Sequence, residues 1–194
     1  MTSQQPLIVG LGGTTRANSS GEKAVRAVLA RTEALGARTL MFGGPELSAL
    51  PHFAPESPDR TPEQIALIEA VRQADGLVIG TPGYHGGISG LVKNAIDLLE
   101  DLREDERSYF EGRAVGCIVT AAGWQAGGVT LQALRGVVHA MRGWPTPLGV
   151  TINTIAQAPF GPDGACIDDG VASQFDLLSR QVMAFCPKAD LRQA

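Results

Sequence analysis

The feature that most constrains this chain is a regular alternation between short apolar runs and longer stretches whose apolar residues recur at helical spacing. The apolar runs have the length and composition of strands buried on both faces. They cover residues 7–11, 38–42, 76–81, 113–120 and 147–152. The periodic stretches predict helices over residues 19–36, 61–75, 91–102, about 134–143 and 168–185. Strands and helices that alternate in this way form a parallel sheet covered by helices on both faces, so we predict an α/β fold.

Charge and hydropathy narrow the class of function. The 194 residues include 16 basic and 20 acidic side chains, a net charge of −4. This balance gives no general attraction to nucleic acid or to an anionic membrane, so we expect neither as a partner. No stretch approaches the roughly 20 apolar residues of a membrane span, and the first residues lack the pattern of a signal peptide. We therefore expect a cytoplasmic protein that forms one domain over residues 1–194.

The cysteines and histidines give no indication of a metal site. Cys117, Cys166 and Cys186 are widely spaced and form no CxxC pair. His52 lies in a proline-rich segment and His139 on a predicted helix, neither beside other residues at ligand spacing. Cys117 falls in the middle of a predicted strand. We expect it to be buried in the core, and we expect no bound metal.

Three glycine-rich loops follow the first, third and fourth predicted strands. They cover residues 12–20, 81–90 and 121–128. Ligands of parallel α/β sheets bind at the carboxyl ends of the strands, beside the point where the strand order reverses. Because the carboxyl ends of parallel strands share one edge, the three loops predict a single binding site.

The first loop has the composition of a phosphate site. It leads from a strand to a helix N-terminus, where free N–H groups favour an anion. Thr14, Ser19 and Ser20 add hydroxyl groups and Arg16 adds a cation. In the alternative interpretation, Ser19 and Ser20 only cap the helix, Ser19 in a capping box with Glu22, and Arg16 is solvated. We favour phosphate binding, although the loop matches neither GxGxxG nor GxxxxGK[ST].

The second loop is suited to a planar ligand. Its sequence from Thr81 to Asp97 is TPGYHGGISGLVKNAID. Glycines allow the backbone to approach a flat ligand edge closely, and Tyr84 offers a ring face. Lys93 and Asp97 are four residues apart on the following helix, so they are expected to pair with each other or across a subunit boundary.

The pattern T-P-x-Y-x-G-G-x-x-G-x-x-K-N-A-I-D resembles that of the NAD(P)H-dependent FMN reductase family. The Gly-Thr-Thr-Arg loop and the segment that starts at Ala122 resemble the other two FMN-binding loops of that family, and the similarity extends over residues 7–152. The resemblance implies a flavodoxin-like fold: a three-layer, doubly wound sandwich with a five-stranded parallel sheet in the order 2-1-3-4-5.

The resemblance also assigns three groups of residues to FMN. Those assigned to the phosphate are Thr14, Arg16, Ser19 and Ser20. Those assigned to the isoalloxazine are Pro82, Tyr84, His85, Gly86 and Gly87. Those assigned to its pyrimidine end and its surroundings are Gly123, Trp124, Gln125, Gly127 and Gly128. Lys93, Asn94 and Asp97 are expected to support the second loop and a subunit contact.

Two positions depart from the family pattern. The family often has asparagine where His85 stands, and Trp124 is bulkier than many residues of the third loop. We interpret His85 as a flavin contact rather than as a proton donor, because hydride transfer needs alignment more than an acid or a base. We expect Trp124 either to stack on a nicotinamide or a partner, or to pack against a neighbouring subunit. We expect no catalytic side chain.

The resemblance implies an NAD(P)H-dependent FMN reductase that uses FMN, with NADPH or NADH as co-substrate. Electrons then pass to a quinone, an azo or nitro compound, or free FMN that supplies a flavin-dependent monooxygenase. A homodimer or homotetramer is expected, with the helix after the second loop at the interface. Two alternatives remain open: a flavodoxin-like electron carrier without NAD(P)H turnover, and a phosphate-binding regulatory domain without flavin.

Overall fold

The computed structural model describes residues 5–186, so the first four and last eight residues of the predicted domain lie outside the described residues. Its central sheet contains β1 (Leu7–Gly12), β2 (Arg38–Phe42), β3 (Gly76–Tyr84) and β5 (Ala114–Ala121) in the parallel order β2-β1-β3-β5. The next position is filled by β6 (Trp144–Pro145) and β7 (Val150–Asn153), which both pair in parallel with β5. The predicted order of five parallel strands is confirmed.

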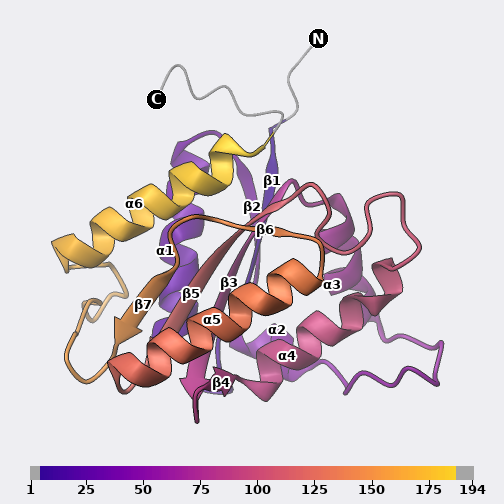
Figure 1. The fold of residues 1–194 in the computed structure, drawn as a ribbon, viewed down its shortest axis with the longest axis horizontal. Coiled ribbons are helices and arrows are strands. Elements are labelled where there is room, and N and C mark those ends of the chain that lie inside the picture. Colours follow the sequence, from indigo (N-terminus) through magenta and orange to yellow (C-terminus); the bar gives the residue numbers. More distant parts are fainter. Residues whose placement is uncertain (1–4, 187–194) are drawn as a thin grey trace.

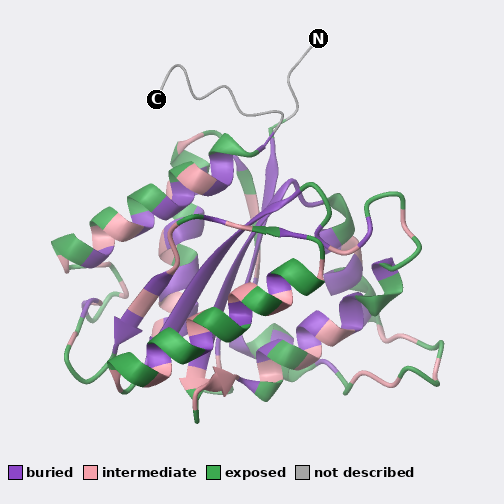
Figure 2. Ribbon diagram, in the orientation of Figure 1, coloured by how far each residue is buried: buried purple, intermediate pink, exposed green. Residues whose placement is uncertain are grey.

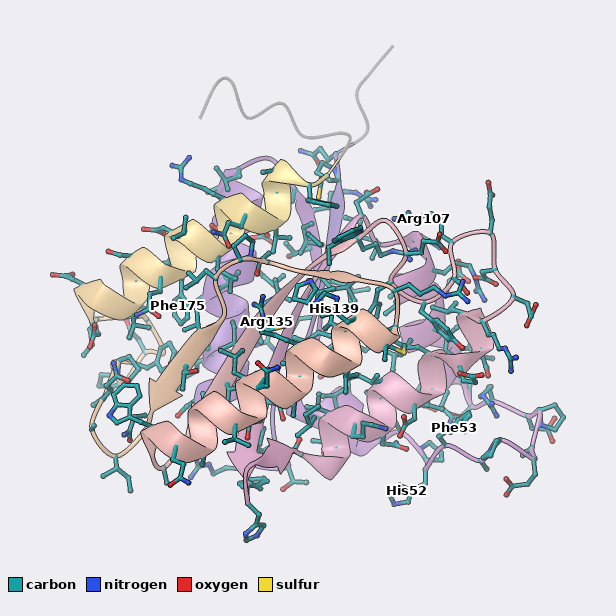
Figure 3. All side chains as sticks on the ribbon, viewed as in Figure 1. His52, Phe53, Arg107, Arg135, His139 and Phe175 are labelled. Atoms are coloured by element: carbon teal, nitrogen blue, oxygen red, sulfur yellow. The ribbon has the colours of Figure 1, made fainter. Side chains whose placement is uncertain are left out.

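The fifth strand differs from the prediction in being split. The prediction was one strand over residues 147–152, whereas residues 146–149 separate β6 from β7 and only the Thr146 N–H among them still bonds to β5, at the Val115 carbonyl. Prolines at 145 and 147 remove two backbone N–H groups there. Arg135, which is labelled in Figure 3, holds the interruption from outside, because its Nη1 donates to the carbonyl oxygen of Thr146 at 2.7 Å.

Helices cover both faces of the sheet (Figure 1). On one face lie α1 (Ser20–Ala34) and α6 (Asp169–Ala184), packed on a core that includes Ile8, Val78 and Ile118. On the other lie α3 (Pro62–Gln73), α4 (Gly90–Asp97) and α5 (Trp124–Ala140), on a core that includes Val9, Leu77 and Val115. Neighbouring residues of the central strands thus enter opposite cores, which explains why β1, β5 and most of β3 are buried on both faces, as Figure 2 shows.

Three further elements refine the predicted pattern. A short helix, α2 (Gly44–Ser48), lies between β2 and α3, where the sequence pattern predicted no helix. The helix predicted over 91–102 ends in a 3-10 turn, η1 (Leu98–Leu102). A small antiparallel strand, β4 (Gly87–Ile88), folds back on the end of β3. No helix within residues 5–186 is both long and apolar enough to cross a membrane.

Arg113 is fully buried where the chain enters β5. Its guanidinium donates to the carbonyl oxygens of Ala74 (2.8 Å), Tyr109 (2.7 Å) and Arg72 (2.8 Å). Burial lowers its pKa to about 10. Because two of these carbonyls belong to the end of α3, one side chain ties that helix to the amino end of β5.

Candidate functional site

The three glycine-rich loops meet at the carboxyl edge of the sheet, the lower edge in Figure 1. They surround a cavity of about 470 Å³, within the size range of small-ligand sites. Eight of the fourteen predicted site residues line it: Thr14, Arg16, Ser19, Ser20, Pro82, Tyr84, His85 and Gly123.

The first loop places the N-terminus of α1 in the cavity. Ser19 is the N-cap, and its Oγ accepts a hydrogen bond from the Glu22 N–H at 3.3 Å. The N–H groups of Ser20 and Gly21, the first two helical residues, have no partner within the helix and remain available to an anion. Arg16 is the only lysine or arginine among the residues that line this cavity.

Glu22 does not complete the predicted capping box. Its carboxylate instead accepts hydrogen bonds from Arg26 Nε at 3.0 Å and Nη2 at 2.8 Å, and from the Gly44 N–H at 3.3 Å. The cause is the short helix α2, which brings Gly44 within reach of the buried carboxylate. The Glu22 carboxylate therefore joins the first turn of α1 to the start of α2.

The second loop is a tight hairpin between β3 and β4. His85 and Gly86 form its turn, with φ of 53° and 77°. Positive φ at both positions is typical of the two-residue turns that join antiparallel strands, and histidine tolerates it better than most residues. Pro82, Tyr84 and His85 line the cavity, whereas Gly86 and Gly87 only build the turn and the return strand.

The end of β3 lies unusually close to α5. A Cβ added to Gly83 would lie 2.9 Å from Thr130 Oγ1, 3.2 Å from the Ala121 Cβ and 3.3 Å from the Ala126 carbonyl oxygen. Contacts of this length do not fit a side chain. Gly83 therefore sets the spacing between the second and third loops.

The third loop is shorter than predicted, because α5 begins at Trp124. Gly123 is the N-cap, and the first backbone bond of the helix runs from the Gly127 N–H to its carbonyl. Trp124 and Gln125 are exposed on the first turn, and Gly128 is exposed on the next. Gly127 is buried, and a Cβ there would lie 2.3 Å from Thr151 Cγ2. None of these four residues lines the cavity.

Seven lining residues were not among the predicted site residues: Gly21, Gly83, Thr120, Ala121, Ala122, Ala126 and Thr154. Thr154 follows the fifth strand, and its N–H donates to the Ala121 carbonyl at 2.8 Å. The rule that sites lie at the carboxyl ends of strands also applies to this strand and to β5, so it could have found Thr120 and Thr154. Ala121, Ala122 and Ala126 have no polar group in the side chain, so the sequence could not indicate that they line a site.

The helix after the second loop makes two kinds of contact. Lys93 and Asp97 form an ion pair with each other at 2.5 Å, one of the two predicted arrangements. Asn94 holds the loop that follows α2: its Oδ1 accepts from the Phe53 N–H at 2.8 Å and its Nδ2 donates to the Pro51 carbonyl at 3.1 Å. Asn94 thus supports a different loop from the one predicted.

No group of three or more histidine, cysteine, aspartate or glutamate side chains among the described residues could hold a metal ion. His52 and Phe53 lie on the loop beside α4, whereas His139 lies on α5, as Figure 3 shows.

The cavity has the chemistry of a site for a phosphorylated planar ligand. The unpaired N–H groups of α1, three hydroxyl side chains and Arg16 gather at one part of its wall. Gly83, Ala122, Gly123 and Ala126 leave a second part of the wall almost without side chains, and the exposed ring of Tyr84 flanks it. The residues present therefore fit FMN, the group that the resemblance implies.

Comparison with known proteins gives a family-level match. The model of the family described as NADPH-dependent FMN reductase matches residues 6–157. An FMN-dependent NADPH-azoreductase of Staphylococcus aureus is 37% identical over 81 residues, which are 42% of this chain and 39% of that protein. The chain thus spans less than half the length of the curated relatives it matches.

Solved structures resemble the whole fold at low identity. An NADH:FMN oxidoreductase in its apo form superposes with a TM-score of 0.70 at 20% identity, over 96% of this chain and 91% of that chain. A flavodoxin of Streptococcus pneumoniae superposes with a TM-score of 0.62 at 11% identity, over 92% and 98%. At these identities the similarity establishes the flavodoxin-like fold.

Proposed function

Because the chain belongs to the NADPH-dependent FMN reductase family, we propose that it binds FMN in the cavity at the carboxyl edge of the sheet and reduces it with NAD(P)H. One observation carries this proposal. A helix N-terminus with free N–H groups and a slot walled by glycine and alanine open into the same cavity. The first suits a phosphate monoester and the second suits a planar ring.

Binding of the phosphate is proposed for the first loop. The Ser20 and Gly21 N–H groups point from the start of α1, and Thr14, Ser19 and Arg16 line the same wall. Thr14 Oγ1 accepts from the Arg16 N–H and donates to the Arg16 carbonyl, both at 3.2 Å. These bonds shape the turn that presents Arg16, so part of the site is formed before the ligand arrives.

Binding of the ring is proposed for the slot between the second and third loops. The chemistry that FMN would supply there is the exchange of a hydride equivalent and of electrons between NAD(P)H and an acceptor. Pro82, Tyr84 and His85 of the second loop, together with Ala122 and Gly123, would hold the ring, because all five line the cavity. No acidic or basic side chain is required, and His85 serves as a contact.

The N-terminus of α5 adds an electrostatic role. Its first bonded N–H is that of Gly127, so the N–H groups of Trp124, Gln125 and Ala126 have no partner within the helix. Their partial positive charge favours negative charge beside Gly123. We assign to this helix end the stabilisation of charge at the pyrimidine end of the reduced ring.

For the acceptor we propose a small planar compound: a quinone, or an azo or nitro aromatic. Tyr84 and Trp124 are 58% and 57% exposed near the cavity, and such rings stack on planar molecules. Supply of reduced flavin to a monooxygenase is the alternative acceptor role. A homodimer or homotetramer through α4 belongs to the same proposal.

An anaerobic spectral titration tests the function. FMN is added to the protein, then NADPH or NADH, while the flavin absorbance is followed. We expect binding of FMN and direct bleaching by at least one nicotinamide. Arg16→Gln should weaken FMN binding about tenfold, because a charge-assisted hydrogen bond is lost. Arg38→Gln, the same charge change on exposed β2, should leave FMN binding unchanged.

Two outcomes contradict the proposal in different ways. Tight FMN binding without bleaching by either nucleotide would make the protein an electron carrier. Failure to bind FMN at all would remove the flavin from the interpretation of the three loops.

A further inference from the structure

A second cavity, of about 640 Å³, lies on the other side of the first loop. It is a groove between the outer face of α1 and the segment 162–166, which leads from β7 to α6. Asn18 lines this groove, whereas Arg16 and Ser19 on either side of it line the proposed FMN cavity. The two cavities are therefore separated by a single turn of chain.

Three cations from α1 line the groove, and two of them are already paired. Arg26 is held by the buried carboxylate of Glu22 at 2.8 Å. Arg31 pairs with Asp176 at 2.5 Å and lies 5.6 Å from the centre of the Phe175 ring, a residue labelled in Figure 3. These pairs fix the two guanidinium groups and leave little of their charge for another partner.

Lys23 is the exception. It is only half exposed, yet within residues 5–186 its ammonium group has neither an ion-pair nor a hydrogen-bond partner. Its Cε lies 3.7 Å from the position of a Cβ added to Gly164, so its stem runs along the segment 162–166. A lysine at the wall of a groove that has no partner in the protein leaves its charge available to an anion bound there.

The rest of the groove favours a nucleotide over a simple anion. Ala27, Ala30 and Pro162 give it small apolar walls, against which a flat base can lie. Asp163, also in the groove, accepts the Ala165 N–H through Oδ1 at 3.0 Å and keeps its second oxygen for a hydroxyl or amino donor. One free cation beside one carboxylate matches a ligand that carries both phosphate and hydrogen-bond donors.

We propose that this groove binds the phosphorylated adenosine half of NADPH, with Lys23 on its phosphate. The proposal rests on the proposed function, since the nicotinamide end must reach the FMN cavity. The two cavities lie on either side of the turn at Asn18, so a dinucleotide that crosses this turn would have one end in each. The groove would then select NADPH over NADH, because NADH lacks the 2′-phosphate that an unpaired lysine recognises.

Calorimetry with 2′,5′-ADP tests the groove without any redox readout. We expect 2′,5′-ADP to bind the protein more tightly than 5′-AMP, with an affinity that falls as salt is added. Lys23→Gln should weaken 2′,5′-ADP about tenfold, and Lys23→Glu should weaken it further. Arg38→Gln on β2 is the matched control and should leave binding unchanged. No binding of 2′,5′-ADP, or equal binding to Lys23→Glu, would overturn the proposal.

Kinetics then distinguish NADPH from an unrelated nucleotide. Lys23→Gln should raise KM for NADPH about tenfold, with kcat and KM for NADH unchanged. Binding of 2′,5′-ADP without this change in KM would overturn the assignment to NADPH. Failure of the proposed function would be observed separately, as absent FMN binding or absent bleaching. The calorimetry does not depend on that result, because it measures only the binding of 2′,5′-ADP.

Discussion

Among single residues, Cys117 has a pKa that the fold shifts strongly. It lies in the middle of β5, fully buried, as the apolar run around it predicted. Burial raises the pKa of its thiol to about 12, and the nearby positive charge of Arg135 offsets this only in part. The folded protein therefore keeps the thiol neutral at pH values where an unfolded chain ionises it.

This difference predicts a loss of stability in alkali. The folded pKa of Cys117 lies above its ordinary value of 9.0, so its contribution is complete below about pH 9 and is lost towards pH 12. We expect Cys117 alone to cost about 1.4 kcal/mol of unfolding free energy per pH unit in that window. Urea unfolding at pH 8 and pH 10 measures the free energy of unfolding for wild type and Cys117→Ala. The contribution of Cys117 is the extra loss between the two pH values in the wild type. Equal pH slopes in the two proteins would contradict it.

Among the elements, α5 shows where sequence reasoning reached its limit. The glycines at 127 and 128 predicted a loop, but the helix already begins at Trp124. Gly127 is needed because the helix packs directly on Thr151, where a Cβ would collide. A glycine selected for close packing looks the same in sequence as one selected for a turn, so the predicted third loop was too long.

The close approach of β3 and α5 gives a prediction at this scale. Gly83→Ala should push the two elements apart, cost about 1–3 kcal/mol of stability and weaken FMN binding. Gly136→Ala is the matched control, because a Cβ there meets nothing within 4 Å and should stabilise α5 by about 0.5–1 kcal/mol. Urea unfolding and FMN titration measure both effects. Normal FMN affinity in Gly83→Ala would contradict the role given to this spacing.

For the whole molecule, the layers followed from the alternation of apolar runs and helical periods, whereas the strand order followed from the family resemblance. The convergence of the first and second loops was also predictable from the position of each loop after a parallel strand. Two features were not predictable: the division of the last strand, and the hydrogen bonds by which Asn94 holds the loop after α2. Both depend on contacts between segments that are distant in sequence. Ala122 and Ala126 line the cavity because of where the fold places them, and their side chains have no group that would indicate this in the sequence.

Two hydrophobic cores share one sheet, which predicts that they unfold together. Cys117 belongs to the core under α3, α4 and α5, and Cys186 belongs to the core under α1 and α6. Pulsed thiol labelling across a urea series, read by peptide mass spectrometry, should give both cysteines the same midpoint. Cys166, which is only half buried, should react at lower urea. Separate midpoints for Cys117 and Cys186 would show two unfolding units instead of one.

The split between β6 and β7 also affects how molecules of this protein meet at high concentration. A long outer strand exposes a row of free backbone groups on which another chain can extend the sheet. Here the outermost strands on this side have only two and four residues, and the chain between them leaves the ladder. The interruption therefore protects the protein from polymerising strand by strand into fibrils along this edge.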